Sequence, residues 1–351
     1  MMLQRQSLRA AGTEVLLRPV AVFMPVIALM MSHVASADEA PVERQAVIVV
    51  VGAEGTAEYG QQFQLWADRW EDAVRKGAAD FRRIGSPSPS AVTPDSDLTQ
   101  LTNAVQELGN RQTAEPLWIV LIGHGTFDSR TATFNLNGPD IDAQAMVQLC
   151  SNCQRPLAII NCSSCSAPFL NALSGDNRVV VTATKDGNQI QYSRFGDAMS
   201  QAIGDAAADI DRDGQTSLLE AWLYASRRTA EFYSEEGRLA TEHALLDDNG
   251  DALGTRAELF EGYRPKAGIK EPGRIDGSQA SRWHLIRSPE EQLLTTAERE
   301  QRDDLERKLE ALRSRRADFS EEAYLNELEP LAVALAEIYR AVEQRDASAT
   351  P

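Results

Sequence analysis

A histidine and a cysteine each follow a long apolar segment of this 351-residue chain. His124 stands between two glycines just after 118–122, and Cys162 comes soon after 157–160. The thiolate is the attacking species in cysteine chemistry, and a neighbouring imidazole can lower its pKa or manage its proton. The glycine after the histidine can bring a backbone N–H close to a substrate. We therefore take His124 and Cys162 as a candidate catalytic pair.

Strands and helices that alternate along the chain must position this pair. Buried strands are expected at 46–51, 81–84, 118–122, 157–160 and 178–183. Helices are expected at 61–76, 97–108, 169–173 and 195–203, where apolar residues recur at spacings of three and four. This alternation predicts an α/β fold in which helices cover both faces of a mostly parallel sheet. Active sites of such sheets lie at the carboxyl ends of the strands, where His124 and Cys162 fall.

The residues at these two strand ends resemble a known family. In 121–128, Leu-Ile-Gly-His-Gly-Thr-Phe-Asp, an apolar strand ends in His-Gly and a small residue, and Cys-Ser-Ser at 162–164 follows the next long strand. Both motifs resemble the caspase-like cysteine peptidase superfamily, and within it the legumain-like branch. The similarity covers about 45–233 and is carried by short motifs.

The resemblance implies hydrolysis of peptide bonds in a polypeptide substrate through a thioester. Cys162 would be the nucleophile and His124 the acid/base, and the backbone N–H groups of Gly125 and Cys162 would form the oxyanion hole. Cys165 stands where the family has a glycine, which makes it an alternative nucleophile. The alternative function is a catalytically inactive, caspase-like calcium-binding and interaction module.

The four cysteines form a pattern of their own. Cys150, Cys153, Cys162 and Cys165 are spaced C-x2-C-x8-C-x2-C. Paired C-x2-C motifs are typical of zinc sites, but eight intervening residues that are mostly strand make a poor zinc ribbon. Disulfides within or between the pairs compete in an exported protein, and one that includes Cys162 would disable it. A zinc- or disulfide-stabilised structural domain is therefore a third interpretation.

The most specific local signal is the twelve-residue segment 209–220. It has carboxylates at positions one, three and five, a glycine at six and a glutamate at twelve, as in an EF-hand loop. Helical patterns flank it on both sides. An acidic surface loop that fits by chance is the alternative. The predicted calcium ligands are Asp209, Asp211, Asp213, Gln215, Ser217 and Glu220.

A second acidic stretch follows at 247–251. Asp247, Asn249 and Asp251 place oxygen ligands at alternate positions, without a glycine at position six or the terminal glutamate. We interpret it first as a turn and second as a weaker calcium site. Calcium at either stretch is expected to brace the fold rather than to perform chemistry.

The first 37 residues have the features of an export signal. Three arginines precede an apolar run at 20–31, and Ala-Ser-Ala follows at 35–37. An uncleaved anchor is the alternative. Removal of 1–37 takes away three arginines and one glutamate, so the net charge changes from −17 to −17 − 2 = −19. This charge argues against nucleic-acid binding through a basic surface. We expect a periplasmic or extracellular protein.

The composition changes near the C-terminus. We expect a linker at 271–289 and a pair of antiparallel amphipathic helices at 290–345, turning near 317–320. Pro330 is expected to kink or restart the second helix. The hairpin is either a structural appendage or a surface for a protein partner.

Overall fold

The computed structural model describes residues 43–85, 95–266 and 275–349. The predicted export signal at 1–37 and the first part of the predicted linker at 271–289 lie outside these residues. In the described part of the chain, no helix is both long enough and apolar enough to cross a membrane.

The core of the fold is a seven-stranded sheet. Its order is β10 (Thr255–Arg256), β9 (Leu245–Asp247), β8 (Arg178–Thr182), β7 (Leu157–Asn161), β3 (Leu117–Ile122), β1 (Ala46–Val51) and β2 (Asp80–Ile84). The five strands from β8 to β2 are parallel, while β9 is antiparallel to β8 and β10 to β9. The predicted α/β class with a mostly parallel sheet is confirmed.

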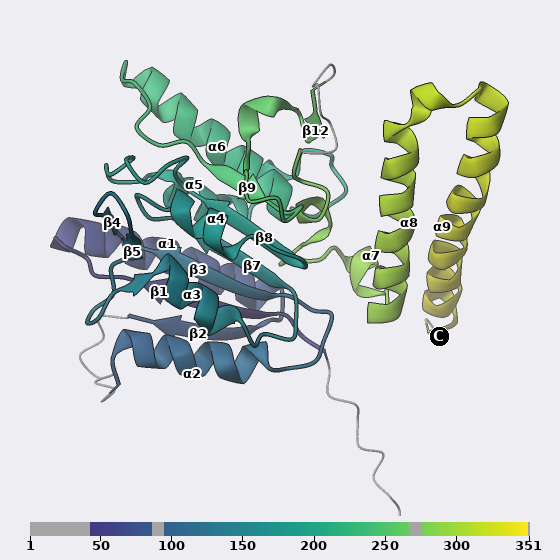
Figure 1. Ribbon diagram of the computed structural model, residues 1–351. Helices are drawn as coiled ribbons and strands as arrows, with labels where there is room; N and C mark the ends of the chain where they lie inside the picture. The colour runs from purple at the N-terminus through teal and green to yellow at the C-terminus, as the bar shows by residue number, and fades with distance from the viewer. Residues whose placement is uncertain (1–42, 86–94, 267–274, 350–351) are drawn as a thin grey trace, which may run out of the picture. The chain divides into compact units, whose positions relative to one another are not determined.

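Helices lie on both faces of the sheet (Figure 1). One face packs against α1 (Ala57–Lys76), α5 (Phe195–Ala202) and α6 (Leu218–Glu235). The other face packs against α2 (Asp97–Gly109), α3 (Ala143–Cys150) and α4 (Ala167–Leu173). Successive side chains of a strand point to opposite faces, so Trp118 of β3 belongs to the first core and Leu117 to the second. The continuous apolar strands therefore serve two cores at once.

Several short elements complete the fold and were not anticipated from the sequence. A three-stranded antiparallel sheet of β4 (Gly125–Phe127), β5 (Ala132–Phe134) and β6 (Ile141–Asp142) begins directly after His124. A small hairpin pairs β11 (Phe260–Glu261) with β12 (Arg264–Pro265). Single 3-10 turns are η1 (Ala206–Ala208), η2 (Ala257–Leu259), η4 (Ala280–Arg282) and η5 (Arg316–Asp318).

The C-terminal residues form the helical hairpin expected there. After α7 (Pro289–Gln292), α8 (Thr296–Ser314) and α9 (Glu321–Ala349) pack through a small core that includes Leu305 and Ile338. Of the two outcomes expected at Pro330, a kink or a restart, the restart is wrong, because α9 runs through this residue as one helix. A proline removes one backbone hydrogen bond, and the bonds on either side of Pro330 maintain the helix.

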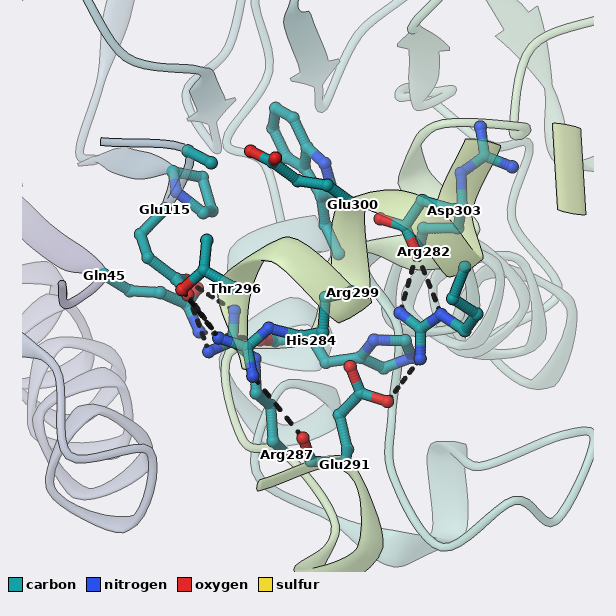
Figure 2. Close-up of a pocket in the computed structure, with 14 residues that line it drawn as sticks. Gln45, Glu115, Arg282, His284, Arg287, Glu291, Thr296, Arg299, Glu300 and Asp303 are labelled. Atoms are coloured by element: carbon teal, nitrogen blue, oxygen red, sulfur yellow. Dashed lines mark hydrogen bonds and ion pairs between the residues drawn. The ribbon is translucent and has the colours of Figure 1, made fainter. Parts of the chain in front are cut away.

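Residues 275–289, within the predicted linker, are packed rather than free. Leu285 is fully buried, and Gln45 donates a hydrogen bond to the backbone carbonyl of His284. The buried carboxylate of Glu115 pairs with Arg287 and Arg299 at the junction with α8 (Figure 2). Gln45 and Glu115 line the pocket drawn in Figure 2. They precede β1 and β3, so this pocket lies at the amino ends of the strands. His124 lies at the opposite, carboxyl end.

Candidate functional site

His124 lies beyond the carboxyl end of β3, among aromatic side chains of the α1 face. Its ring centroid is 5.0 Å from that of Tyr59, 5.1 Å from Phe63 and 6.2 Å from Tyr192. Its Nε2 lies 3.3 Å from the carbonyl oxygen of Glu54. Because a carbonyl only accepts, Nε2 carries the hydrogen and Nδ1 the lone pair of the neutral ring. Partial burial lowers the imidazole pKa, although the Glu54 contact opposes this change.

Cys162 is part of the apolar core. Its side chain belongs to the α1/α5 cluster and is 1% exposed. Its Cβ lies so close to Gly196 that a methyl group there would come within 2.9 Å, and the Trp66 ring closes the same space at 2.7 Å. Burial raises the pKa of this thiol, and the negative charge of Glu242 raises it further. The predicted nucleophile is therefore a protonated, enclosed thiol.

Cys165 lies closer to the His-Gly loop. It has a left-handed backbone, with φ of 56°, and its Sγ lies 3.8 Å from the carbonyl oxygen of Gly125 and 3.9 Å from that of Gln189. The residue is 1% exposed, and burial raises the pKa of its thiol. Both contacts use the thiol as a donor, an arrangement that favours the protonated form.

The His-Gly loop and the cysteine loop meet through Ser164 and through the Cys165 thiol. Among the residues that the structure describes, no hydrogen bond joins His124 to Cys162 or Cys165. Gly125 N–H donates to Ser164 Oγ at 3.2 Å, and Ser164 Oγ–H donates back to Gly125 O at 3.0 Å. The second expected oxyanion donor, Cys162 N–H, donates to Leu121 O at 2.9 Å. Both predicted oxyanion donors are thus used inside the protein.

The sequence reasoning missed the serines of this loop. Ser163 Oγ donates to Asn161 Oδ1 at 2.6 Å, and Ser163 N–H donates to the same oxygen at 3.0 Å. The signal that could have found them is strand register. Leu121 lies opposite Asn161 in the parallel pair β3–β7, so the residues after each strand end continue side by side.

Glu242, also missed, fixes the amino end of α5 beside Cys162. Its buried carboxylate accepts hydrogen bonds from Ser193 Oγ and from the backbone N–H groups of Arg194 and Phe195. Burial raises its pKa, although these hydrogen bonds act in the opposite direction. A carboxylate at a helix amino end is electrostatically favourable. Glu242 is forty-seven residues from Phe195, and no local pattern in the sequence indicates the contact.

The four cysteines do not converge. All are free thiols; Cys150 and Cys153 belong to the core on the α2–α4 face, and Cys162 to the core on the opposite face. A zinc site needs four sulfurs about 2.3 Å from one point. Within the described residues, the one group of three or more potential metal ligands contains aspartates and no cysteine.

That group is part of the predicted calcium loop. One carboxylate oxygen each from Asp209, Asp211 and Asp213 lie within 4.8 Å of one another. Two oxygens bound to one calcium at 2.3–2.6 Å can be at most about 5.2 Å apart, so the three carboxylates fit such an ion. Gly214 has φ of +88°, as the sharp turn of the loop requires. The pKa of Asp211 is raised to about 6 by burial and by the charges of Glu220 and Asp213.

The other predicted ligands of this loop have protein partners. Glu220 is buried, and its carboxylate accepts from the backbone N–H groups of Ile210, Asp211 and Ser217, at 2.8, 3.1 and 2.9 Å. Ser217 and Glu220 form a capping box at the start of α6. Gln215 Oε1 accepts from Ser288 N–H at 3.1 Å. Bidentate coordination by Glu220 would exchange these hydrogen bonds for the ion.

The weaker acidic stretch at 247–251 is a turn after β9. The side chains of Asn249 and Asp251 each accept a hydrogen bond from the backbone N–H of the residue two positions later in the chain. Asp247 is fully buried and accepts from Ser174 and Gly250, while its second carboxylate oxygen has no partner. One carboxylate oxygen of the turn is therefore without a partner. Within the described residues, this turn does not form a cluster of three potential metal ligands.

Comparison with known proteins gives structural neighbours only. No protein-family description matches the chain, and no curated protein matches it. The Drosophila initiator caspase Dronc is similar over 60% of this chain and 81% of its own, at 14% identity and a TM-score of 0.39. Caspase-1 from Spodoptera frugiperda is similar over 59% and 86%, at 10% identity and a TM-score of 0.38. At these scores neither neighbour bears on the chemistry of this chain.

Proposed function

We propose that this chain is a catalytically inactive, caspase-like interaction module braced by calcium. The observation that carries the proposal is the reciprocal pair of hydrogen bonds between Ser164 and Gly125. These bonds occupy the backbone N–H that would stabilise an oxyanion. A preorganised donor contributes to catalysis only when it is aimed at the reacting oxygen.

The state of the two cysteines supports the same conclusion. A nucleophilic thiolate needs an exposed or electropositive environment, and Cys162 has an apolar one with a carboxylate nearby. Partial burial lowers the pKa of His124, which disfavours a charged imidazole, and its Nε2 is directed at Glu54 O. The rival function, a legumain-like endopeptidase with His124 and either Cys162 or Cys165, requires these side chains to rearrange.

Calcium would be held by Asp209, Asp211 and Asp213. These carboxylates repel one another, and a bound cation would relieve the repulsion and join η1 to α6. Calcium at this position would brace the fold rather than take part in chemistry, since the loop is remote in sequence from the His-Gly and cysteine loops. Export to a periplasmic or extracellular compartment, as the first 37 residues predict, would expose the loop to calcium at millimolar levels.

The resemblance to a peptidase family suggests a polypeptide as the partner. The surface of α1 is suited to this role, because Glu54, whose carbonyl contacts His124, lines an open hollow with Gln61 and Leu65, which is 48% exposed. Carboxylate, amide and apolar groups together can contact both the backbone and the side chains of an extended peptide.

The test is cysteine labelling with an iodoacetamide probe on the reduced, calcium-loaded full chain, followed by peptide mapping. We expect Cys162 to react only when the protein is unfolded, and at a rate that His124→Ala does not change. A peptide-library assay on the same sample should show no cleavage. Fast labelling of Cys162 or Cys165 that falls in His124→Ala would overturn the proposal and establish the peptidase.

A further inference from the structure

A C-x2-C turn closes the end of α3. The helix ends at Cys150, and the N–H of Cys153 donates to the carbonyl oxygen of Cys150 at 3.2 Å. These two cysteines are thus residues i and i+3 of a hydrogen-bonded turn, in which the Cα atoms lie less than about 7 Å apart. Disulfides usually join Cα atoms about 4.4–6.8 Å apart. The backbone already has a geometry that a disulfide can bridge.

The two thiols differ in exposure and acidity. Cys150 is buried in the core, whereas Cys153 is only partly buried. The proximity of the two thiols lowers the pKa of Cys153 and raises that of Cys150. The positive charges of Arg178 and Arg155 lower the Cys153 pKa further, against the effect of burial. The more accessible sulfur is therefore the better thiolate, and the buried one retains its proton.

The surroundings of Cys153 keep its sulfur in place. A methyl group on Gly109 would lie 2.6 Å from Cys153 Sγ, so the sulfur fills the space that this glycine leaves at the end of α2. Arg155 is buried and donates to the carbonyl oxygens of Glu115 and Arg44, both at 2.7 Å. Its side-chain bonds go to neutral carbonyls, so its charge remains available to a neighbouring thiolate.

We propose that Cys150 and Cys153 are a redox-active pair that is oxidised by small or protein disulfides to an intramolecular disulfide. The Cys153 thiolate attacks one sulfur of the external disulfide, whose S–S bond breaks and releases a thiolate. The Cys150 thiol then loses its proton to solvent, and its sulfur attacks Cys153 Sγ and displaces the second thiolate. The protein loses two electrons, and the external disulfide becomes two thiols.

This pair is independent of the candidate catalytic loop. Cys162 belongs to the core on the opposite face of the sheet, and Cys165 is directed at the carbonyl oxygens of Gly125 and Gln189. Neither has a thiol partner among the described residues. Oxidation at the turn should therefore spare both, and the proposal stands or falls separately from the inactive-module proposal.

The experiment exposes the reduced full chain to glutathione buffers of stepped oxidised-to-reduced ratio, with acid quenching, alkylation and peptide mapping. We expect a Cys150–Cys153 disulfide in the wild type, with no glutathione retained on Cys153. In Cys150→Ala, the mixed disulfide on Cys153 should accumulate. In Cys153→Ser, Cys150 should react at least about tenfold more slowly than Cys153 does in the wild type.

Two controls keep the result interpretable. Cys165→Ser should oxidise at the turn as the wild type does, and urea should make pairing unselective among the four cysteines. Because Cys150→Ala creates a cavity, the wild-type mapping is decisive by itself. Stable glutathione on Cys153 in the wild type, or a disulfide that includes Cys162 or Cys165, would overturn the proposal.

Discussion

Ser164 and Gly125 exchange two hydrogen bonds, one in each direction between the hydroxyl and the backbone of the His-Gly loop, at 3.2 and 3.0 Å. Both residues are buried. The hydroxyl therefore satisfies a donor and an acceptor that the fold has removed from water. An oxyanion hole would need the same N–H to be free for substrate, and here it donates to the Ser164 hydroxyl.

Ser164→Ala is expected to destabilise the protein without producing activity. The substitution leaves the buried Gly125 N–H without the hydroxyl that accepts its hydrogen bond, and an unsatisfied buried polar group costs about 1–3 kcal/mol. Urea unfolding measures the loss. Ser151→Ala is the matched control, because the exposed Ser151 hydroxyl bonds a helix-end carbonyl and its removal should cost less than about 0.5 kcal/mol. Peptide cleavage by Ser164→Ala would instead indicate that a working dyad lies beneath the hydroxyl.

Calcium is expected to bind the 209–220 loop and to stabilise the fold. With a Kd of about 0.1 mM, calcium at 1 mM would add about 1.4 kcal/mol to the free energy of unfolding. Calorimetric titration and thermal unfolding measure the two quantities. Asp213→Asn removes one of the three clustered carboxylates and should weaken binding at least about tenfold.

The control for calcium is Asp128→Asn. Asp128 accepts backbone hydrogen bonds from Arg130 and Thr131, much as the loop aspartates accept theirs, but it lies outside the loop. Its replacement should leave calcium affinity unchanged. Equal stabilisation by calcium of the wild type and Asp213→Asn would exclude this loop as the site. Glu220→Gln should destabilise α6 even in a chelator, because Glu220 closes the capping box.

The main architecture could be predicted because its signals are local and strong. The segments 46–51 and 118–122 are apolar throughout, and both are central strands buried on both faces. The strands β4, β5 and β6 have two or three residues each, too few for a period of two to be visible. A restart at Pro330, one of the two expected outcomes, does not occur, because a proline removes only one backbone hydrogen bond of the helix.

The site was only half predictable for a different reason. The alternation of strands and helices along the chain predicts that His124 and Cys162 come after neighbouring parallel strands. The two strands, β3 and β7, do pair. Which side chain faces which core depends on register and on the path of the chain after each strand. Cys162 enters the α1/α5 core, and Ser164 takes the position next to Gly125. Sequence spacing does not contain this information.

Gly196→Ala is expected to destabilise the fold by about 1–3 kcal/mol through overpacking. The added methyl group would lie 2.7 Å from the Trp66 ring and 2.9 Å from Cys162 Cβ, so at least one of them must move. Gly204→Ala is the matched control, since its methyl group would meet Ala73 at 3.6 Å, an ordinary contact. Urea unfolding compares them. Similar stability of the two variants would contradict the tight packing around Cys162.

His284 is expected to make the protein less stable as the pH falls. Burial, with the charges of Arg302 and Arg287, lowers its pKa from 6.5 to about 3. Between these values the unfolded chain holds the proton and the folded one does not. The stabilisation is therefore complete above about pH 6.5, and it declines on acidification by up to about 1.4 kcal/mol per pH unit.

The measurement is the free energy of unfolding from pH 4.5 to 7.5 in the wild type and in His284→Gln. Removal of the imidazole should flatten the acid decline, whatever its effect on overall stability. Asp276→Asn is the control of opposite sign. The folded pKa of Asp276 is raised to about 7, mainly by burial, so this carboxyl group adds stability as the pH falls from 7 toward its ordinary value. Its removal should steepen the acid decline. Parallel profiles for the wild type and His284→Gln would contradict the prediction. They would mean that the imidazole is protonated in the folded protein over this pH range, despite the nearby arginine charges.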